Sequence, residues 1–483
     1  MKFKPVSLAP KLPALAVAAV LLASCGGGGG GAPATIPTNA GGNTGPLRTP
    51  PPTTGPATTL NTLRINVDAG PVPTLSRSIN VAYVTVTVCA PGTTPATAAC
   101  QTIDHVMVDT GSSGLRLLKS ALYSSLKLPQ VLNSAGNAIG ECTSFVIGAT
   151  WGSVRSADIY LGGELVSNAS FQDIGDTPGG ATGVPVDCSG TGTIQGDTGI
   201  LTIDQEQLGA NGILGVGQLP NDCPPCLIPA PGYYVPATYY NCNSAGCSNA
   251  PSVTSSQIVQ NPVALLPQDN NGVLIDLSST NPYGTYVGSG TSGYTALSGS
   301  LILGIGTESN NTPTLGSGQN EYDADIYGNL LTSYTDSVGG TTPVPMLGVL
   351  DSGSNGVYFP DSTIAQCTGQ IGSPWYCPDS NTLSLVASNQ SNTADVSAYV
   401  PVTFTLASAS VLLSNPANII GANIGADFDF QPELGSNLFS AAYPMFDWGL
   451  PFFYNQPVYT GIAGATAASG VSATGVANGY WIY

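Results

Sequence analysis

One ten-residue pattern occurs twice in this chain of 483 residues, and it limits the folds that the chain can adopt. Residues 106–115 read VMVDTGSSGL, and residues 348–357 read GVLDSGSNGV. Each copy predicts a buried strand that delivers an aspartate into a tight glycine turn, followed by a hydroxyl side chain. An apolar segment that ends in glycine follows each copy, at residues 212–215 and 448–449. Such a repeat predicts two similar lobes, each of which supplies one carboxylate.

The two aspartates of the repeat, Asp109 and Asp351, define a specific chemistry when two lobes bring them together. Two carboxyl groups at hydrogen-bonding distance share one proton and titrate as a unit. The ionised member can take a proton from a water molecule that attacks an amide carbonyl, while the protonated member polarises the carbonyl oxygen. This chemistry needs no metal and no cofactor, and we expect neither.

Taken together, these motifs resemble the pepsin-like bilobal aspartic proteases, and more closely a bacterial lipoprotein family with that fold. The resemblance covers about residues 79–460 and includes Gly-Ile-Leu-Gly-Val-Gly at 212–217 and the segments 161–163 and 299–304. It implies an all-β protein of two pepsin-like β-barrel lobes with an active-site cleft between them. It also implies a catalytic pair and a set of residues that support this pair. The pair is Asp109 and Asp351, and the supporting residues are Thr110, Gly111, Ser112, Ser352, Gly353 and Ser354.

Three positions depart from the family pattern. Arg116 stands where the family has a tryptophan, and the flap segment lacks the family's tyrosine and offers Trp151 instead. We therefore expect Arg116 to stack on Trp151 at the substrate cleft. Asp447 replaces an apolar residue before Trp448-Gly449, and a buried aspartate there needs a hydrogen-bonding partner.

The charge of the chain excludes several classes of function. It has 28 acidic and 10 basic side chains, and no Lys or Arg follows Arg155. Nucleic-acid binding needs clustered basic residues, so we expect no nucleic-acid partner. His105 is the only histidine, which excludes a multi-histidine metal site. We expect His105 to be an ordinary strand residue.

The N-terminus reads as an export signal. Three lysines precede the apolar run 12–22, and Ala-Ser-Cys25 follows its last residue, so that 22–25 read Leu-Ala-Ser-Cys. This ending resembles the lipobox of bacterial lipoproteins and implies a signal peptide over 1–24 and acylation of Cys25. The alternative is an ordinary signal peptide with an incidental cysteine. We expect an exported lipoprotein of the cell envelope, at the outer membrane or cell surface, held by its lipid.

The remainder is divided into a tether and two lobes. Residues 25–75 are rich in Gly, Pro and Thr and predict a flexible tether. The N-terminal lobe is predicted over 76–260, with a cysteine-rich insertion at 218–258, and the C-terminal lobe over 261–483. Short alternating runs such as 84–88 predict strands throughout. The one convincing helical stretch is 117–127.

Ten cysteines remain after Cys25, an even number that suits an oxidising compartment. We expect Cys89 to pair with Cys100, Cys367 with Cys377, and Cys142 with Cys188. Four more cysteines form a cluster for which we favour two disulfides over a zinc site, with the pairing left open: Cys223, Cys226, Cys242 and Cys247.

The leading function is an aspartic endopeptidase that acts on a peptide or protein substrate, as a monomer. The first alternative is a catalytically inactive binding protein on the same fold, because a fold does not fix a function. The second is a surface adhesin, which the long tether and the tyrosine-rich insertion favour. The tyrosines concerned are Tyr233, Tyr234, Tyr239 and Tyr240.

Overall fold

The structure is a computed structural model that describes most of residues 60–483. The ranges it leaves out within that span are 75–77, 96–98, 146–147, 190–194, 197–198, 201–203, 228–237, 282–292, 336–343, 370, 373, 393–398, 416 and 428–443. The predicted signal peptide, Cys25, most of the predicted tether, Tyr233 and Tyr234 lie outside the described residues. Among the described residues, no helix has the length and apolar character needed to cross a bilayer.

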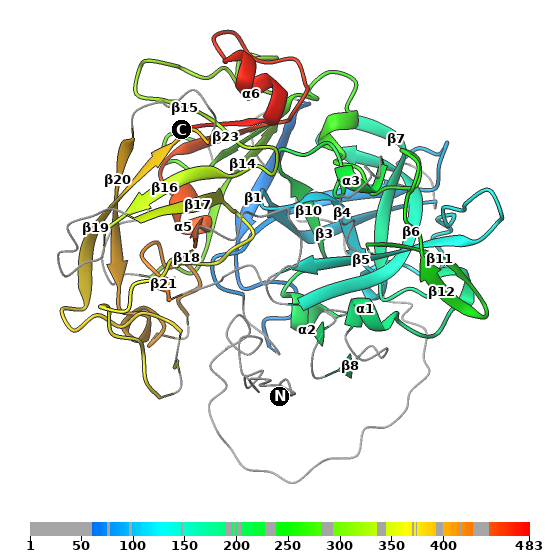
Figure 1. Ribbon diagram of the computed structural model, residues 1–483, viewed down its shortest axis with the longest axis horizontal. Coiled ribbons are helices and arrows are strands. Elements are labelled where there is room, and N and C mark those ends of the chain that lie inside the picture. Colours follow the sequence, from blue (N-terminus) through cyan, green and yellow to red (C-terminus); the bar gives the residue numbers. More distant parts are fainter. Residues whose placement is uncertain are drawn as a thin grey trace, which may run out of the picture.

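The described chain is all-β, as the short alternating runs predict, and it forms two large sheets (Figure 1). In β2, the side chains of Val84, Val86 and Val88 are buried while Thr85 is exposed, which is the alternation of a strand with one face on a core. The larger sheet has 15 strands in the order β12-β11-β5-β6-β7-β4-β10-β3-β2-β1-β14-β13-β23-β24-β15. Their bounds are β1 Thr62–Val67, β2 Ala82–Cys89, β3 Cys100–Asp109, β4 Ser113–Leu118, β5 Ala138–Phe145, β6 Gly148–Leu161, β7 Glu164–Ile174, β10 Gly212–Val216, β11 Tyr239–Asn243, β12 Gly246–Asn249, β13 Gly272–Asp276, β14 Leu297–Leu303, β15 Glu321–Asp323, β23 Pro457–Gly461 and β24 Tyr480–Ile482.

The second sheet lies to the left of β1 in Figure 1 and has seven strands in the order β20-β19-β16-β17-β22-β18-β21. Their bounds are β16 Leu330–Tyr334, β17 Val344–Leu350, β18 Val357–Tyr358, β19 Thr382–Gln390, β20 Val400–Ala407, β21 Gly425–Ala426 and β22 Met445–Trp448. A small pair, β8 Gln195–Gly196 and β9 Gly199–Ile200, stands apart. The predicted boundary at 260/261 does not divide the sheets, because β13, β14, β15, β23 and β24 join the larger one.

The helices are single turns or little more. They are α1 Val186–Ser189, α2 Gln205–Leu208, α3 Pro224–Leu227, α4 Ala409–Leu412, α5 Leu450–Phe453 and α6 Ala473–Asn478, with 3-10 turns η1 Lys119–Ala121, η2 Pro178–Gly180 and η3 Val263–Leu265. The predicted helix over 117–127 is wrong. Leu117 and Leu118 complete β4, which is buried along its whole length between β10 and β7, and only the single turn η1 follows. Pairing on both edges overrides the local helical pattern.

The two halves of the chain repeat one topology around their aspartates. In the first half, β10 lies between β3 and β4, parallel to β3 and antiparallel to β4. In the second half, β22 lies between β17 and β18, parallel to β17 and antiparallel to β18. Each aspartate turn therefore joins two strands that a later strand separates. The predicted repeat is confirmed at the level of strand topology.

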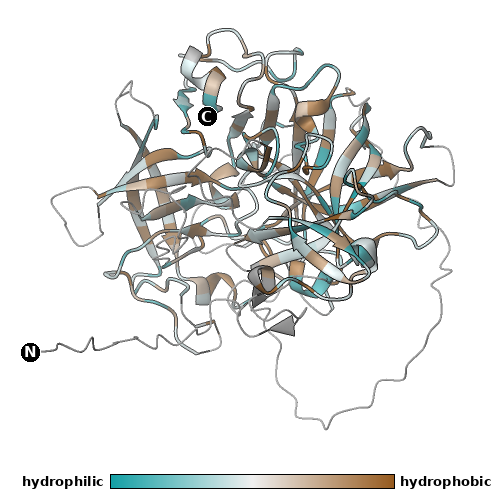
Figure 2. Ribbon diagram, turned by 45° about the vertical axis from the view of Figure 1, so that its right-hand side comes forward, coloured by the Kyte–Doolittle hydropathy of each residue, from teal (hydrophilic) through white to brown (hydrophobic). Residues whose placement is uncertain are grey.

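Apolar side chains from both halves form one large core, and Figure 2 shows the hydrophobic residues in brown along the strands. Five disulfides are present, at Cys89–Cys100, Cys142–Cys188, Cys223–Cys226, Cys242–Cys247 and Cys367–Cys377. The three predicted pairs are confirmed. The cysteine cluster forms two disulfides and not a zinc site.

The predicted tether, residues 25–75, extends past the point at which the fold begins. Residues 62–67 form β1, which pairs with β2 of the first half and with β14 of the second half. The side chains of Leu63, Ile65 and Val67 are buried in the common core. The segment that we assigned to a linker is therefore a strand that joins the two halves of the larger sheet.

A shortened chain that begins at residue 58 is expected to fold, while one that begins at residue 68 is not. Removing β1 exposes three core side chains, each worth about 1.5–3 kcal/mol when buried, and leaves β2 and β14 without their shared partner. Thermal unfolding followed by circular dichroism measures the difference. Equal cooperative transitions in the two shortened chains would show that β1 is dispensable.

Candidate active site

The two aspartate turns meet face to face. A methyl carbon added to Gly111 would lie 2.7 Å from Cγ of Asp351 and 2.8 Å from each of its carboxyl oxygens. A methyl carbon added to Gly353 would lie 2.7 Å from Oδ1 of Asp109. Each turn therefore presents its glycine to the carboxylate of the other turn, and any side chain at these two positions would push the carboxylates apart.

Four hydrogen bonds between the turns fix this arrangement with near twofold symmetry. Thr110 Oγ1 donates to the carbonyl of Leu350 at 2.7 Å, and Ser352 Oγ donates to the carbonyl of Val108 at 2.8 Å. Each hydroxyl also accepts from the backbone N–H of the other, at 3.1 Å for Thr110 N and 2.9 Å for Ser352 N. Both side chains are buried, so these bonds are shielded from water.

Each carboxylate has the same two local donors. The N–H of Gly111 donates to Oδ1 of Asp109, and the N–H of Gly353 donates to Oδ1 of Asp351, both at 2.8 Å. The hydroxyl of Ser112 donates to Oδ2 of Asp109, and that of Ser354 lies 2.9 Å from Oδ2 of Asp351. The structure thus brings the predicted pair and its predicted supporting residues into one constellation.

The electrostatics of the pair are those of two carboxyl groups that share a proton. Burial, followed by the charge of Asp351, raises the pKa of Asp109 to about 8. Asp109 is therefore the protonated member in acidic and neutral solution. Such an arrangement can activate a water molecule and polarise a carbonyl at the same time.

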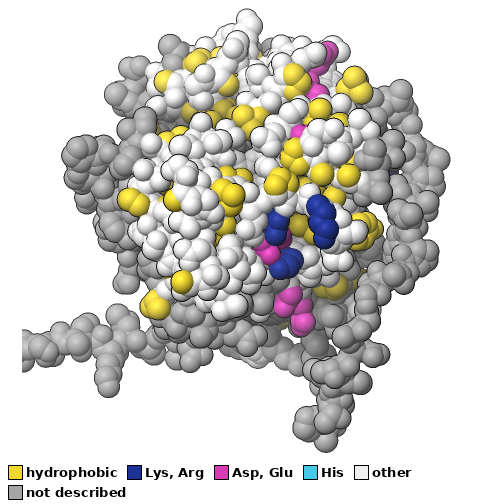
Figure 3. Space-filling model, turned by 90° about the vertical axis from the view of Figure 1, so that its right-hand side faces the viewer, with side chains coloured by type: hydrophobic (Ala, Val, Ile, Leu, Met, Phe, Trp, Pro, Cys, Tyr) yellow, Lys and Arg dark blue, Asp and Glu magenta, His cyan; other side chains and the backbone are white. Residues whose placement is uncertain are grey.

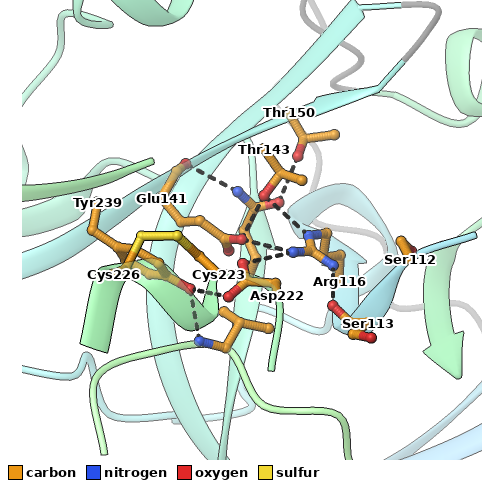
Figure 4. A network of polar contacts seen from close by, with 12 residues as sticks. Ser112, Ser113, Arg116, Glu141, Thr143, Thr150, Asp222, Cys223, Cys226 and Tyr239 are labelled. Atoms are coloured by element: carbon orange, nitrogen blue, oxygen red, sulfur yellow. Dashed lines mark hydrogen bonds and ion pairs between the residues drawn. A yellow bond between two sulfur atoms is a disulfide. The ribbon is translucent and has the colours of Figure 1, made fainter. Parts of the chain in front are cut away.

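Arg116 does not lie at a substrate cleft, and the predicted stacking on Trp151 is wrong. Its side chain is fully buried behind the first aspartate turn (Figure 4). Nη2 contacts Oε1 of Glu141 at 2.8 Å and Oδ2 of Asp222 at 2.9 Å, and Nη1 donates to the carbonyl of Ser113 at 2.9 Å. The aromatic ring near the guanidinium is that of Phe145, 5.9 Å away.

The carboxylates of this network balance the buried arginine. Burial opposes the charge of Arg116, but Glu141 and Asp222 outweigh it and raise the arginine's pKa. Burial also opposes the charge of Glu141, but Arg116 lowers its pKa, whereas burial and Glu141 together raise the pKa of Asp222 well above its usual value. We therefore assign the charge to Glu141 and a proton to Asp222. The phenol of Tyr239 lies 2.7 Å from Oδ1 of Asp222.

This network ties three separate segments to the turn that carries Asp109. Arg116 belongs to β4, Glu141 to β5, and Asp222 to the cysteine-rich insertion. The sequence pattern indicated Arg116 as an unusual residue but gave no indication of Glu141 or Asp222. The sequence contained one indication that Arg116 has acidic partners. An arginine within a buried strand requires carboxyl groups that balance its charge.

Trp151 is a core residue of the same lobe. Its ring packs edge-on against Tyr240 with 5.3 Å between centroids, in a cluster that includes Cys142 and Cys242. Tyr239 and Tyr240 are buried as well, so these two tyrosines of the insertion are not displayed at the surface. The space-filling view of this lobe shows few charged side chains among uncharged and apolar ones (Figure 3).

His105 is not an ordinary strand residue. Its backbone is left-handed, with φ at 50°, and its ring nitrogens lie 3.2 Å from Asp68 and 3.4 Å from Asp104. Burial opposes its charge, but the two carboxylates raise its pKa to about 9. Within the described part of the chain, no group of three or more His, Cys, Asp or Glu side chains is placed to hold a metal ion.

The two large sheets and the meeting of the two aspartate turns define the class of the protein, an all-β protein in which each half of the chain supplies one aspartate turn beside an inserted strand. The chain belongs to the family described as "Protein of unknown function (DUF3443)", whose model matches residues 57–483. No curated protein sequence matches the chain. Among solved structures, the chain is similar to the aspartic proteinase from Irpex lacteus. That match has 14% sequence identity and a TM-score of 0.42, and it covers 87% of this chain and 96% of that chain.

Proposed function

We propose that the protein is an aspartic endopeptidase with Asp109 and Asp351 as its catalytic pair. The observation that supports this proposal is the near-symmetric meeting of the two turns, in which each carboxylate faces the glycine of the other turn. A structural role alone does not require a buried carboxyl group, that of Asp109, to lie beside a second one, since their mutual repulsion is destabilising. Paired carboxyl groups of this kind suit acid–base chemistry on an amide bond.

The geometry suggests a role for each member of the pair. Asp351, as the ionised member, takes a proton from a water molecule, and the resulting hydroxide attacks the amide carbonyl carbon. Asp109, as the protonated member, donates its proton to the carbonyl oxygen, which gives a gem-diol. The proton on Asp351 then passes to the amide nitrogen, the carbon–nitrogen bond breaks, and Asp109 recovers a proton as the new carboxyl group forms.

We also propose that the protein is exported and lipid-anchored through Cys25, and that it acts as a monomer on peptides or proteins in the cell envelope or outside the cell. The motif Leu-Ala-Ser-Cys after an apolar run supports this location. The tether then runs from Cys25 to about residue 59, because β1 begins at Thr62. Mass spectrometry of the mature N-terminus tests it, and an unmodified Cys25 would contradict it.

The experiment that tests the proposed activity uses the shortened chain that begins at residue 58. The folded, disulfide-complete protein is incubated with a diverse peptide library from pH 3 to 7, and new peptide ends are identified by mass spectrometry. We expect cleavage that a hydroxyl-containing transition-state inhibitor such as pepstatin abolishes. The absence of cleavage across this range would contradict the proposal.

The second candidate function is a catalytically inactive binding module on the same fold. The observation that favours it concerns the two residues that we expected at the flap and substrate cleft. Arg116 and Trp151 are both buried in the lobe and do not stack on each other. A folded protein that binds pepstatin without cleaving any peptide would support this candidate.

A further inference from the structure

A third carboxyl group adjoins the candidate catalytic pair. Asp447 lies on β22, the strand inserted between β17 and β18, and its Oδ2 is 2.6 Å from Oγ of Ser354. The same Oγ is 2.9 Å from Oδ2 of Asp351. Ser354 therefore connects Asp447 directly to the second aspartate of the pair. The first aspartate has no matching group on β10, where Ile213, Leu214 and Gly215 occupy the inserted strand.

The number of hydrogens available decides how Asp351, Ser354 and Asp447 are hydrogen-bonded to one another. A serine hydroxyl has one hydrogen, so Ser354 cannot donate to both carboxylates at once. At least one of the two carboxyl groups must then carry a proton and donate it to Oγ. The other can accept the hydroxyl proton of Ser354 in turn.

The surroundings place that proton on Asp447. Its Oδ1 is buried and has no hydrogen-bonding partner in the described part of the chain, which an ionised carboxylate tolerates poorly. The titratable groups that face it are Asp351, Asp109 and Tyr358, and no Lys or Arg occurs in the sequence after Arg155. Burial, followed by the charge of Asp351, raises the pKa of Asp447 well above its usual value.

We propose that Asp447 is a protonated positioning residue that donates to Ser354, so that Ser354 donates to Asp351 and keeps Asp351 the ionised member of the pair. This inference rests on the proposed peptidase function for its catalytic consequence. The hydrogen bonds from Asp447 to Ser354 and from Ser354 to Asp351, which we call the proton chain, do not depend on activity. When Asp447 loses its proton, Ser354 is drawn toward the new carboxylate and no longer stabilises the charge on Asp351. Activity should therefore fall as Asp447 ionises.

Two variants separate this role from simple packing. In Asp447→Asn the amide nitrogen still donates to Ser354 but cannot ionise, whereas Asp447→Leu has no donor. We expect Asp447→Asn to cleave about tenfold faster than Asp447→Leu, the usual order of effect for one hydrogen bond to a charged group, with the difference in kcat and not in KM. The activity of Asp447→Asn should also persist to higher pH than that of the unaltered protein. Asp379→Asn, which changes an exposed carboxylate, is the matched control.

A carboxyl titration decides the proton chain independently of cleavage. With aspartate labelled at the side-chain carboxyl carbon, nuclear magnetic resonance from pH 3 to 9 should show a carboxyl of raised pKa that Asp447→Asn removes and Asp379→Asn retains. If that signal is present but no variant cleaves peptides, the proposed function fails while the proton chain stands. An ordinary pKa for Asp447, or identical pH profiles for active unaltered and Asp447→Asn proteins, would overturn the inference.

Discussion

Replacing Asp109 with Asn is expected to make the folded protein more stable at pH 7 while abolishing peptide cleavage. The pKa of Asp109 is raised to about 8 by burial and by Asp351, from an ordinary value of 3.8. At pH 7 the group is therefore protonated in the folded protein and ionised in the unfolded chain. Folding must take up a proton, and this opposes folding more strongly as the pH rises from about 4 to 8.

Asn at position 109 avoids this cost and keeps the local hydrogen bonds. With its carbonyl oxygen in place of Oδ1, Asn accepts from the N–H of Gly111, and with its amide nitrogen in place of Oδ2 it donates to Oγ of Ser112, which then accepts. Each pKa unit corresponds to ~1.4 kcal/mol, so the gain in the free energy of unfolding at pH 7 should be on the order of a few kcal/mol. The gain should disappear near pH 3, where the unfolded aspartate is protonated as well.

Urea unfolding at pH 3, 5 and 7 measures this gain. Asp379→Asn, at an exposed position, serves as the control and should change the free energy of unfolding little at any pH. A stabilisation of Asp109→Asn that does not depend on pH, or a loss of stability at pH 7, would show that the two carboxyl groups do not share a proton.

Replacing Arg116 with Met is expected to destabilise the fold by about 3–5 kcal/mol, the usual cost of leaving a buried charge without its partner. The guanidinium is fully buried and contacts Glu141 and Asp222 as well as the carbonyl of Ser113. Methionine fills much of the volume of the arginine stem, so the loss should come from the carboxylates and not from a cavity. We expect part of this destabilisation to affect the turn that carries Asp109, because Arg116 donates to the carbonyl of Ser113 beside that turn.

Thermal unfolding of Arg116→Met and of a triple variant tests this explanation. The triple variant adds Glu141→Gln, which removes the uncompensated charge, and Asp222→Asn, which replaces the protonated carboxyl group, and it should recover much of the lost stability. Arg64→Met, at an exposed position on β1, is the control and should unfold like the unaltered protein. If the triple variant is no more stable than Arg116→Met, the ion pairs are not what the arginine stabilises.

The sequence predicted that the two aspartate turns meet, because the information for this is local. Each aspartate turn is a short motif, in which Asp, a hydroxyl residue, Gly and Ser must follow one another, and the second copy indicates which two turns must meet. The strand inserted between the two strands that flank each turn was also recognisable in the sequence, from Gly-Ile-Leu-Gly at 212–215 and Trp-Gly at 448–449. The disulfides were predictable for a similar reason, since several of them close short loops.

What the sequence did not predict depends on partners that are distant in the chain. Arg116 was expected beside Trp151, but the acidic groups that compensate it come from β5 and from the insertion. β1 reads as the end of the linker, because its six residues follow directly on the Gly-, Pro- and Thr-rich stretch, and only its pairing with β2 and β14 shows that they belong to the fold. His105 reads as part of a regular strand, yet the pairing of β2 with β3 shifts register beside it, its backbone is left-handed, and its ring contacts Asp68 on a separate segment.

The most direct test of the account compares the rates at which the unaltered protein and Asp351→Asn cleave one peptide chosen from the library, at the pH of maximal activity. Both proteins must first show cooperative unfolding and intact disulfides. We predict that the substitution lowers kcat by about a thousandfold or more, because it removes the group that accepts the proton from water. Cleavage by Asp351→Asn at the rate of the unaltered protein would contradict the assignment of Asp109 and Asp351 as the catalytic pair.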